Sequence, residues 1–270
     1  MLEIYKLTKH FGDTLALDEL SFDVKAGEMV GIVGRSGAGK STLLRTINRL
    51  NSPSSGHILY NEIDVTTLKG SSLRHWRRRC AMIFQQFNLV NRLDVMTNVL
   101  VGRVAHRNTF RTLLKAFNRR ERALAALTLE RVGMAEQILQ RADTLSGGQQ
   151  QRIAIARALV QEPEVVLADE PIASLDPHNA ALVMSTLRDI NQVDGKSVIV
   201  NVHNVDIARE YCDRIIGMRA GRIVFDGPPS AFTNKSFAKI YETDQDGVSG
   251  PENTAAARST SDGQLAATVT

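Results

Sequence analysis

The feature that most constrains this chain is the string from Gly34 to Ser41, which matches the pattern GxxxxGK[ST]. It follows the apolar run MVGIV and precedes the helix-like run TLLRTINRL, so a buried strand leads into the loop and a helix leaves it. The glycines let the backbone form a nest of N–H groups, and the helix start adds partial positive charge. A plain glycine-rich turn before a helix is the alternative, which this context disfavours. The string therefore predicts an α/β fold with a phosphate-binding loop.

Two residues of the loop have specific expected roles. Lys40 places a positive charge on the β- and γ-phosphates of a nucleotide, and Ser41 offers its hydroxyl to Mg²⁺. The predicted nucleotide contacts are Gly34, Arg35, Ser36, Gly37, Ala38, Gly39, Lys40, Ser41 and Thr42.

A pair of acids follows a second apolar run. Asp169 and Glu170 come directly after VVLA, at the carboxyl end of an expected strand, where open α/β sheets bind ligands. Alone, such a pair is more often a solvated loop. Combined with the phosphate loop, it predicts that Asp169 holds the Mg²⁺ shell and that Glu170 orients or deprotonates the attacking water.

A second anion site is predicted at Ser146, Gly147, Gly148 and Gln149, the last four residues of the string LSGGQ. The two glycines precede the helical run QQQRIAIARALV, so they expose backbone N–H groups at a helix start, and Ser146 adds a hydroxyl. A helix cap is the alternative interpretation.

The wider pattern indicates a parallel sheet flanked by helices. Residues 29–33, 165–168 and 198–202 are short apolar runs typical of strands that are buried on both faces. Apolar residues recur at helical spacing in 178–191, and residues 86–145 are helix-rich without a convincing buried strand. Residues 243–270 lack large apolar side chains, so we expect a disordered tail after a domain spanning 1–242.

With these motifs in this order, residues 2–242 resemble the ATP-binding-cassette (ABC) ATPases. The resemblance implies a P-loop NTPase core with a mostly parallel sheet, an N-terminal antiparallel β subdomain and a helical subdomain inserted at about 86–145. It further implies the cofactors ATP and Mg²⁺.

The resemblance also assigns residues that are weak signals by themselves. Phe11 would stack on adenine, Gln85 would reach Mg²⁺ and sense a transmembrane partner, and His203 would lie beside the γ-phosphate. Asp176 belongs to a segment, 174–176, that would contact an opposing subunit. The implied catalytic set is Glu170, His203 and Gln85, and the implied metal set is Ser41, Gln85 and Asp169.

The missing internal repeat bears on assembly. The chain has one phosphate loop and one LSGGQ, and in this family the LSGGQ of one subunit closes on the ATP held by the other. Two complete sites then need two chains, which implies a homodimer with two-fold symmetry.

Several longer stretches resemble the ATPases of bacterial phosphonate importers, among them IFQQFNLVNRLDVMTNVLVGR and LADEPIASLDP. This resemblance implies two permease subunits, indirect work with a periplasmic or extracellular phosphonate-binding protein, and a peripheral position on the cytoplasmic face of the cell (inner) membrane. Import of phosphite, a phosphate ester or a polar amino acid remains the alternative. A non-transport ABC ATPase that binds nucleic acid is a remote one, and we expect no nucleic-acid partner.

The charge distribution leaves one membrane question open. The net charge is +4, and the acidic residues of 243–270 leave the preceding body more basic. Basic residues recur every four positions at Arg103, Arg107, Arg111, Lys115 and Arg119, and a second cluster covers 74–79. A solvated face and attraction to an anionic membrane surface are both compatible with these clusters. Two cysteines without metal-ligand spacing, Cys80 and Cys212, predict reduced thiols.

The composition of residues 243–270 makes the tail dispensable for folding. Removing these residues should leave the ATPase rate and the melting temperature nearly unchanged. Thermal melts and phosphate-release assays on the full and truncated chains test this. A large drop in melting temperature would show that the tail packs on the body.

Overall fold

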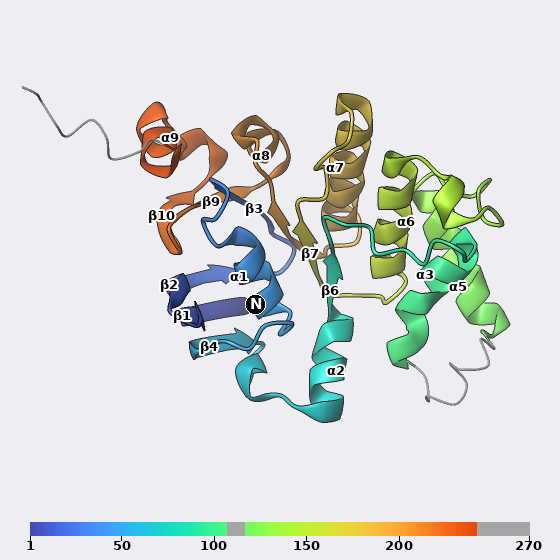
Figure 1. The fold of residues 1–270 in the computed structure, drawn as a ribbon, viewed down its shortest axis with the longest axis horizontal. Coiled ribbons are helices and arrows are strands. Elements are labelled where there is room, and N and C mark those ends of the chain that lie inside the picture. Colours follow the sequence, from blue (N-terminus) through green and yellow to red (C-terminus); the bar gives the residue numbers. More distant parts are fainter. Residues whose placement is uncertain (107–116, 242–270) are drawn as a thin grey trace, which may run out of the picture.

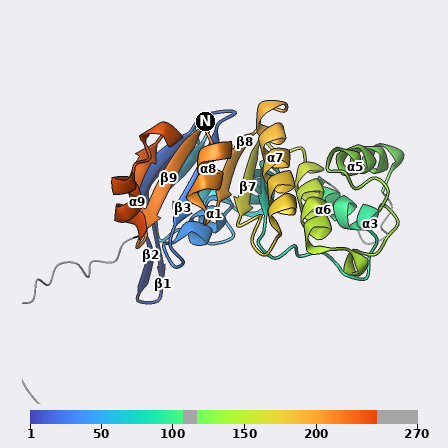
Figure 2. The same cartoon turned by 90° about the horizontal axis from the view of Figure 1, so that it is seen from above.

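The computed structural model describes residues 1–106 and 117–241. In these ranges the chain forms two β-sheets with helices packed around them, and a group of helices stands at one end (Figures 1 and 2). The α/β fold predicted from the sequence is confirmed.

The larger sheet has the strand order β10-β9-β3-β8-β7-β6. Its strands are β3 (Met29–Gly34), β6 (Cys80–Ile83), β7 (Val165–Asp169), β8 (Ser197–Asn201), β9 (Arg214–Arg219) and β10 (Arg222–Gly227). Neighbours from β9 to β6 are parallel, and β10 is antiparallel to β9. Every residue of β3, β7 and β8 is buried, as expected for parallel strands covered on both faces.

The two faces of this sheet carry separate cores, because side chains alternate along a strand. On one face Met29 and Val33 of β3 join the core formed with α7, α8 and α9. On the other face Val30 and Ile32 join the core formed with α1 and the second sheet. The helices of the first face are α7 (Pro177–Gln192), α8 (Val205–Tyr211) and α9 (Asn234–Tyr241).

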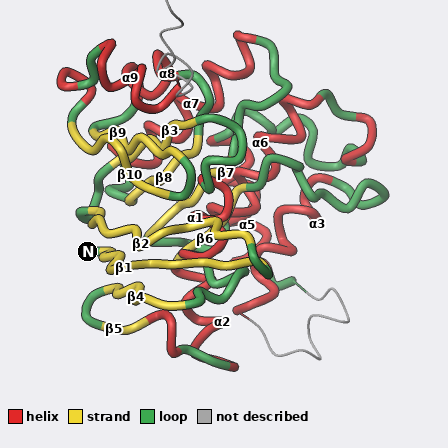
Figure 3. The backbone as a smooth tube through the Cα atoms, turned by 60° about the vertical axis from the view of Figure 1, so that its left-hand side comes forward, coloured by secondary structure: helices red, strands yellow, loops and turns green. Residues whose placement is uncertain are grey.

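The smaller sheet is antiparallel, with the order β2-β1-β4-β5. Its strands are β1 (Leu2–Phe11), β2 (Thr14–Val24), β4 (Ser55–Tyr60) and β5 (Ile63–Asp64). The antiparallel β subdomain implied by the family resemblance is thus present. Helix α1 (Lys40–Ile47) contacts β2 of this sheet as well as β3, β7 and β8 of the larger one (Figure 3). The phosphate loop therefore lies where the two sheets meet.

The helices at the far end of the molecule pack on one another and on the edge of the larger sheet. They are α3 (Val95–Leu100), α5 (Arg119–Arg131) and α6 (Gly147–Leu159), with the short 3₁₀ helices η2 (Val101–His106) and η3 (Ala142–Thr144). Helix α6 contacts both α3 and α5 as well as β6 and α7 (Figure 2). In the described part of 86–145 the only strand-like pairing is an isolated bridge between Asp94 and Arg141. The domain boundaries at 242 and at 86–145 stay predictions.

The cluster at 74–79 is only partly solvated, because Arg74 and His75 are exposed while Trp76 is buried and residues 77–79 are half-buried. It lies on α2 (Gly70–Arg79), after the 3₁₀ helix η1 (Val65–Thr67). Trp76 is buried and donates its indole N–H to the Ile47 carbonyl. Arg77 donates to the Arg49 carbonyl, and Arg79 pairs with Glu164 at 2.7 Å. A run of basic residues in the sequence does not reveal that Arg77 and Arg79 are engaged by a backbone carbonyl and by a carboxylate.

The other basic stripe is described only at its ends. Arg103 donates to the Val160 carbonyl and pairs with Glu162 at 2.7 Å, so its guanidinium is engaged within the chain. Arg107, Arg111 and Lys115 lie outside the described residues.

Two smaller expectations have a direct outcome. Both cysteines are free and buried, as predicted for reduced thiols. Over residues 1–106 and 117–241, the helices are too short or too polar to cross a membrane.

The layered core makes a matched pair of substitutions informative. Ile32 on β3 is 0% exposed, whereas Ile63 on β5 is 50% exposed. Ile32→Ala should lower the free energy of unfolding by about 2–5 kcal/mol because it leaves a cavity between α1 and the sheet. Ile63→Ala should change it by less than about 1 kcal/mol. Urea unfolding of both variants tests this, and equal losses would contradict the assignment of the core.

Candidate functional site

The phosphate loop leads into α1 through glycines at which any larger residue would clash with the backbone. Gly39 has a φ of 98°, and a Cβ there would lie 2.5 Å from the Ala16 carbonyl oxygen. Gly34 has a Cβ position 2.4 Å from the Met218 carbonyl oxygen. Because no side chain caps the start of α1, the helix presents its backbone N–H groups to the loop. A turn of this geometry is suited to binding an anion.

Lys40 is held inside this turn. It is 4% exposed, and its Nζ donates to the carbonyl oxygens of Gly34 at 2.7 Å and Arg35 at 3.0 Å. Burial lowers the pKa of Lys40, while the nearby carboxylates of Glu170 and Asp169 act in the opposite direction. The ammonium is therefore fixed in position beside two acids.

Ser41 and Asp169 lie in direct contact, although 128 positions separate them. The Ser41 hydroxyl donates to Asp169 Oδ1 at 2.6 Å. Asp169 is 1% exposed, and its Oδ2 has no hydrogen bond within the described structure. Arg45 approaches that oxygen to 3.5 Å. A buried carboxylate oxygen beside a hydroxyl is a donor set suited to a hard cation such as Mg²⁺.

Asn201, which the sequence analysis did not single out, contacts both members of this pair. The Asn201 amide donates to Asp169 Oδ1 at 2.8 Å, and it lies 3.4 Å from Ser41 Oγ. In the sequence Asn201 is the single polar residue of the run VIVNV, which predicted only a buried strand. A polar side chain inside an otherwise apolar buried strand was the signal that could have revealed it.

Glu170 contacts His203, which lies nearer the surface than the buried Asp169. Glu170 Oε1 lies 2.7 Å from His203 Nε2, and the Glu170 backbone N–H donates to the Asn201 carbonyl at 3.2 Å. Glu170 has a φ of 50°, in the left-handed region. This turn places consecutive carboxylates in different environments, with Asp169 buried at the sheet and Glu170 toward the histidine.

The signature segment, residues 145–149 (LSGGQ), leads into the start of α6. Ser146 and Gln149 form a reciprocal capping box, so the Ser146 side chain accepts the Gln149 N–H. Gly148 packs against Asn179, which donates its side-chain amide to Asp176 at 2.6 Å and accepts from Arg152 at 3.0 Å. The starts of α6 and α7 are thereby joined. Helix α6 belongs to the helical end of the molecule and α7 packs on the larger sheet beside it, whereas the phosphate loop opens α1 (Figure 1).

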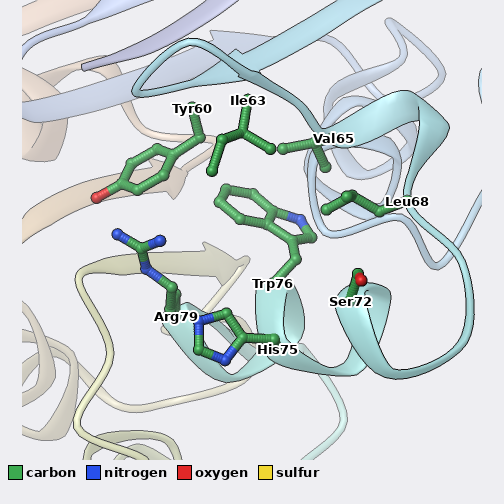
Figure 4. A pocket seen from close by; sticks show the side chains of 8 residues that line it. All are labelled: Tyr60, Ile63, Val65, Leu68, Ser72, His75, Trp76 and Arg79. Carbon is green, nitrogen blue, oxygen red and sulfur yellow. The ribbon is translucent and has the colours of Figure 1, made fainter.

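Two predicted residues stay apart from the buried cluster. Phe11 at the end of β1 is exposed, and the Lys9 ammonium lies 4.7 Å from its ring centroid. Gln85 follows β6 and is exposed, and in the part of the chain that the structure describes it makes no hydrogen bond to Ser41 or Asp169. An exposed hollow lined by Tyr60, Ile63, Trp76, Arg79 and neighbouring side chains contains none of the predicted nucleotide residues (Figure 4).

Comparison with known proteins agrees with this geometry. The family profile described as ABC transporter matches residues 17–173. The chain is 58% identical over 92% of its length to the phosphonates import ATP-binding protein PhnC of Rhizobium johnstonii, of which it covers 89%. It is 59% identical over 89% of its length to the PhnC protein of Rhizobium meliloti, of which it covers 86%.

Solved structures give the same result. The chain superposes on the ATP-binding cassette MJ0796 with a TM-score of 0.75 at 33% identity, and the match covers 85% of this chain and 99% of that one. The MJ0796 structure is a dimer in a post-hydrolysis state bound to ADP and Pi. It superposes with a TM-score of 0.75 at 30% identity on cbiO1 of Clostridium perfringens, part of the transporter complex cbiONQ, covering 88% and 92%.

The chain belongs to the ABC transporter family. It is an ATP hydrolase with the P-loop fold of that family, as the sequence predicted. In this ABC ATPase the buried cluster of Ser41, Asp169 and Asn201 lies at the carboxyl ends of β7 and β8. That edge of the sheet is where open α/β folds bind ligands.

Gly148 offers a matched test of how the signature segment is built. A Cβ at 148 would lie 2.4 Å from the Asn179 side chain, whereas at Gly147 the nearest atom is 3.7 Å away. Gly148→Ala should therefore displace Asn179 from Asp176 and Arg152 and cost about 1–3 kcal/mol of stability. Gly147→Ala should cost less than about 0.5 kcal/mol.

Urea unfolding of the two single variants measures the difference. Adding Asn179→Ala to Gly148→Ala should recover part of the loss because it removes the overlapping atoms. Equal midpoints for Gly147→Ala and Gly148→Ala would contradict the tight contact.

Proposed function

We propose that this chain is the ATP-binding and ATP-hydrolysing subunit of an importer, acting as a homodimer, and that the imported solutes are phosphonates. The observation that carries the enzymatic part is the buried Ser41–Asp169 contact with Lys40 and Glu170 beside it. It joins a phosphate-binding turn, an oxygen donor set and a carboxylate that can act as a base at one edge of the sheet.

The proposed roles follow from position. Lys40 and the loop backbone would hold the β- and γ-phosphates, while Ser41 and Asp169 would hold Mg²⁺, with the exposed Gln85 as the third proposed ligand. Mg²⁺, when bound, neutralises charge on the phosphate oxygens. Glu170 takes the proton of the attacking water, and His203, paired with it at 2.7 Å, orients that carboxylate. Phe11 presents an exposed ring for stacking on adenine.

The proposed dimer follows from the separation of the two anion sites. One chain carries the phosphate loop on α1 and the signature segment on α6, which packs elsewhere on the sheet. In a two-fold pair, Ser146, Gly147, Gly148 and Gln149 of the second chain complete the nucleotide site of the first, with Asp176 at the same interface. The dimeric MJ0796 structure supports this assembly.

A groove offers a place for a membrane partner. It has a volume of about 430 Å³ and is lined by residues from the end of β6, from η2 and from α6. Its lining includes Met82, Phe84, Val101, Gly102 and Arg157, and Phe84 directly precedes Gln85. We infer that each chain of the dimer binds one permease subunit here, which puts the chain at the cytoplasmic face of the membrane. The family relationship to cbiO1, part of a transporter complex, supports this placement.

The solute is inferred from the relatives alone. Several relatives at 54–59% identity are named phosphonates import ATP-binding proteins. The ATPase does not touch the solute in this proposal, so no described residue reads phosphonate chemistry. Phosphite, phosphate-ester or polar amino-acid import would leave this site unchanged.

The role of Glu170 has a direct test. Glu170→Gln keeps the shape but removes the base, so ATP hydrolysis should fall by a factor of about 10²–10⁴ while ATP still binds. The variant should accumulate as an ATP-bound dimer, because the nucleotide bridges the two chains and is not consumed. Light scattering and phosphate release, with and without MgATP, read both effects.

Two controls accompany this variant. Lys40→Ala should bind ATP weakly and stay monomeric, and Glu130→Gln, at an exposed position on α5, should behave like the unaltered chain. A Glu170→Gln protein that stays monomeric in saturating MgATP, or that hydrolyses at the original rate, would refute the role given to Glu170.

The solute has a genetic test. Deleting the gene should abolish growth on a phosphonate as sole phosphorus source and leave growth on phosphate intact. The original gene should restore growth, and the Glu170→Gln gene should not. Normal phosphonate growth with loss of amino-acid import would instead favour the amino-acid alternative.

A further inference from the structure

Asn201 is a polar side chain at the end of a strand whose neighbouring residues are apolar and buried. It ends β8 after Val198, Ile199 and Val200, which are fully buried, and it is itself 0% exposed. In this environment its Oδ1 has no hydrogen-bond partner within the described residues. A buried strand that keeps an unpaired amide oxygen needs a reason for the amide.

The other end of the same amide supplies that reason. Asp169 and Asn201 are directly paired in register between the parallel strands β7 and β8. Asn201 Nδ2 lies 2.8 Å from Asp169 Oδ1. An ionised carboxylate only accepts hydrogen bonds, so the NH₂ group must face Asp169 and the amide oxygen must point away. The unpaired Oδ1 is the consequence of placing a donor against Asp169.

The same NH₂ group also faces Ser41, at 3.4 Å from its Oγ. A hydroxyl has one proton and two lone pairs. The proton of Ser41 goes to Asp169 Oδ1 at 2.6 Å, and Asn201 faces one lone pair. One lone pair of Ser41 is left, together with Asp169 Oδ2, which has no hydrogen bond and is approached by the Arg45 guanidinium to 3.5 Å. The three side chains form a closed triangle, and the acceptors of Ser41 and Asp169 that have no hydrogen bond are available to a cation.

The backbone of Asn201 contributes a second constraint. Its carbonyl accepts the N–H of Glu170 at 3.2 Å, so it fixes the turn that carries the proposed base. One residue thus contacts Ser41, Asp169 and Glu170.

We propose that Asn201 is a positioning residue of the metal site, whose amide locks the hydroxyl of Ser41 and the carboxylate of Asp169 in the orientation that binds Mg²⁺ with the nucleotide. This inference rests on the proposed function, because it assigns Mg²⁺ to the Ser41–Asp169 pair. Asn201 itself does not touch the metal or the nucleotide. Residues of this kind set ligand orientation, and their loss typically weakens metal binding by about 10–100-fold.

The test compares nucleotide affinity with and without the metal. Asn201→Leu replaces the amide by an apolar group with the same branching at Cγ, and Asn201→Val removes the amide with a smaller side chain that is suited to a strand. Isothermal calorimetry measures the Kd of ATP in EDTA and in excess Mg²⁺ for the full chain, and Mn²⁺ electron paramagnetic resonance in the presence of ADP measures metal binding directly. Melting temperatures in EDTA show that each variant is folded.

The matched control is Asn191→Leu. Asn191 is also a buried asparagine, and its amide donates to the carbonyls of Gly27 at 2.8 Å and Lys196 at 2.9 Å. Those two residues precede β3 and β8, at the opposite end of the strands from the phosphate loop. This change removes those two hydrogen bonds and a third that Asn191 Oδ1 accepts from Arg188 at 3.2 Å, without approaching Asp169.

For both Asn201 variants the gain in ATP affinity on adding Mg²⁺ should shrink by about tenfold or more, while affinity in EDTA stays within about twofold. Mn²⁺ binding with ADP should weaken in parallel, and Asn191→Leu should keep the original Mg²⁺ gain. An unchanged Mg²⁺ gain in the Asn201 variants would overturn the proposal. An equal loss in EDTA, or the same loss in Asn191→Leu, would do so as well. If the unaltered chain shows no Mg²⁺ gain at all, the proposed metal site itself fails.

Discussion

The arrangement of the site depends on the 2.6 Å hydrogen bond from Ser41 to Asp169. It joins the first turn of α1 to the end of β7, two segments that are remote in the sequence. In the sheet, β8 lies between β3, which leads into the loop, and β7, which carries Asp169. The loop and its helix must therefore cross over β8, and Asn201 at the end of that strand lies under the contact. The buried Lys40 and the half-buried Glu170 lie near the same contact.

The sequence predicted the parts of this site that obey local rules. The phosphate loop, the apolar strands and the α7 periodicity each follow from a pattern within about 15 residues, and the structure has all three. The parallel pairing followed because strands that are apolar on both faces must be covered on both faces. The antiparallel sheet came from family resemblance alone, since β1 and β2 show bulges that break a clean alternation.

Contacts made across long separations could not be predicted in this way. Nothing near Asn201 in the sequence shows that its amide meets Asp169, and nothing near Arg79 shows that Glu164 neutralises it. The cluster at 74–79 was open to a solvated or membrane-facing interpretation because composition gives charge but not direction. In the fold, Trp76 binds that helix to α1 by donating a hydrogen bond to the Ile47 carbonyl. Arg77 donates to the Arg49 carbonyl, and Arg79 pairs with Glu164.

In the proposed dimer, each nucleotide site is formed by the phosphate loop of one chain and the signature segment of the other. Cross-linking tests it most directly, because both native cysteines are buried and the exposed Ser36 and Ser146 can each be changed to cysteine in separate chains. The two variants are mixed with a non-hydrolysable ATP analogue and treated with a short bifunctional thiol reagent. A nucleotide site shared by two chains predicts a cross-linked product of twice the chain mass. This product forms in the mixture, needs the nucleotide, and is missing with either variant alone. A mixture that yields no nucleotide-dependent product, or a cross-link formed within one chain carrying both cysteines, would contradict it.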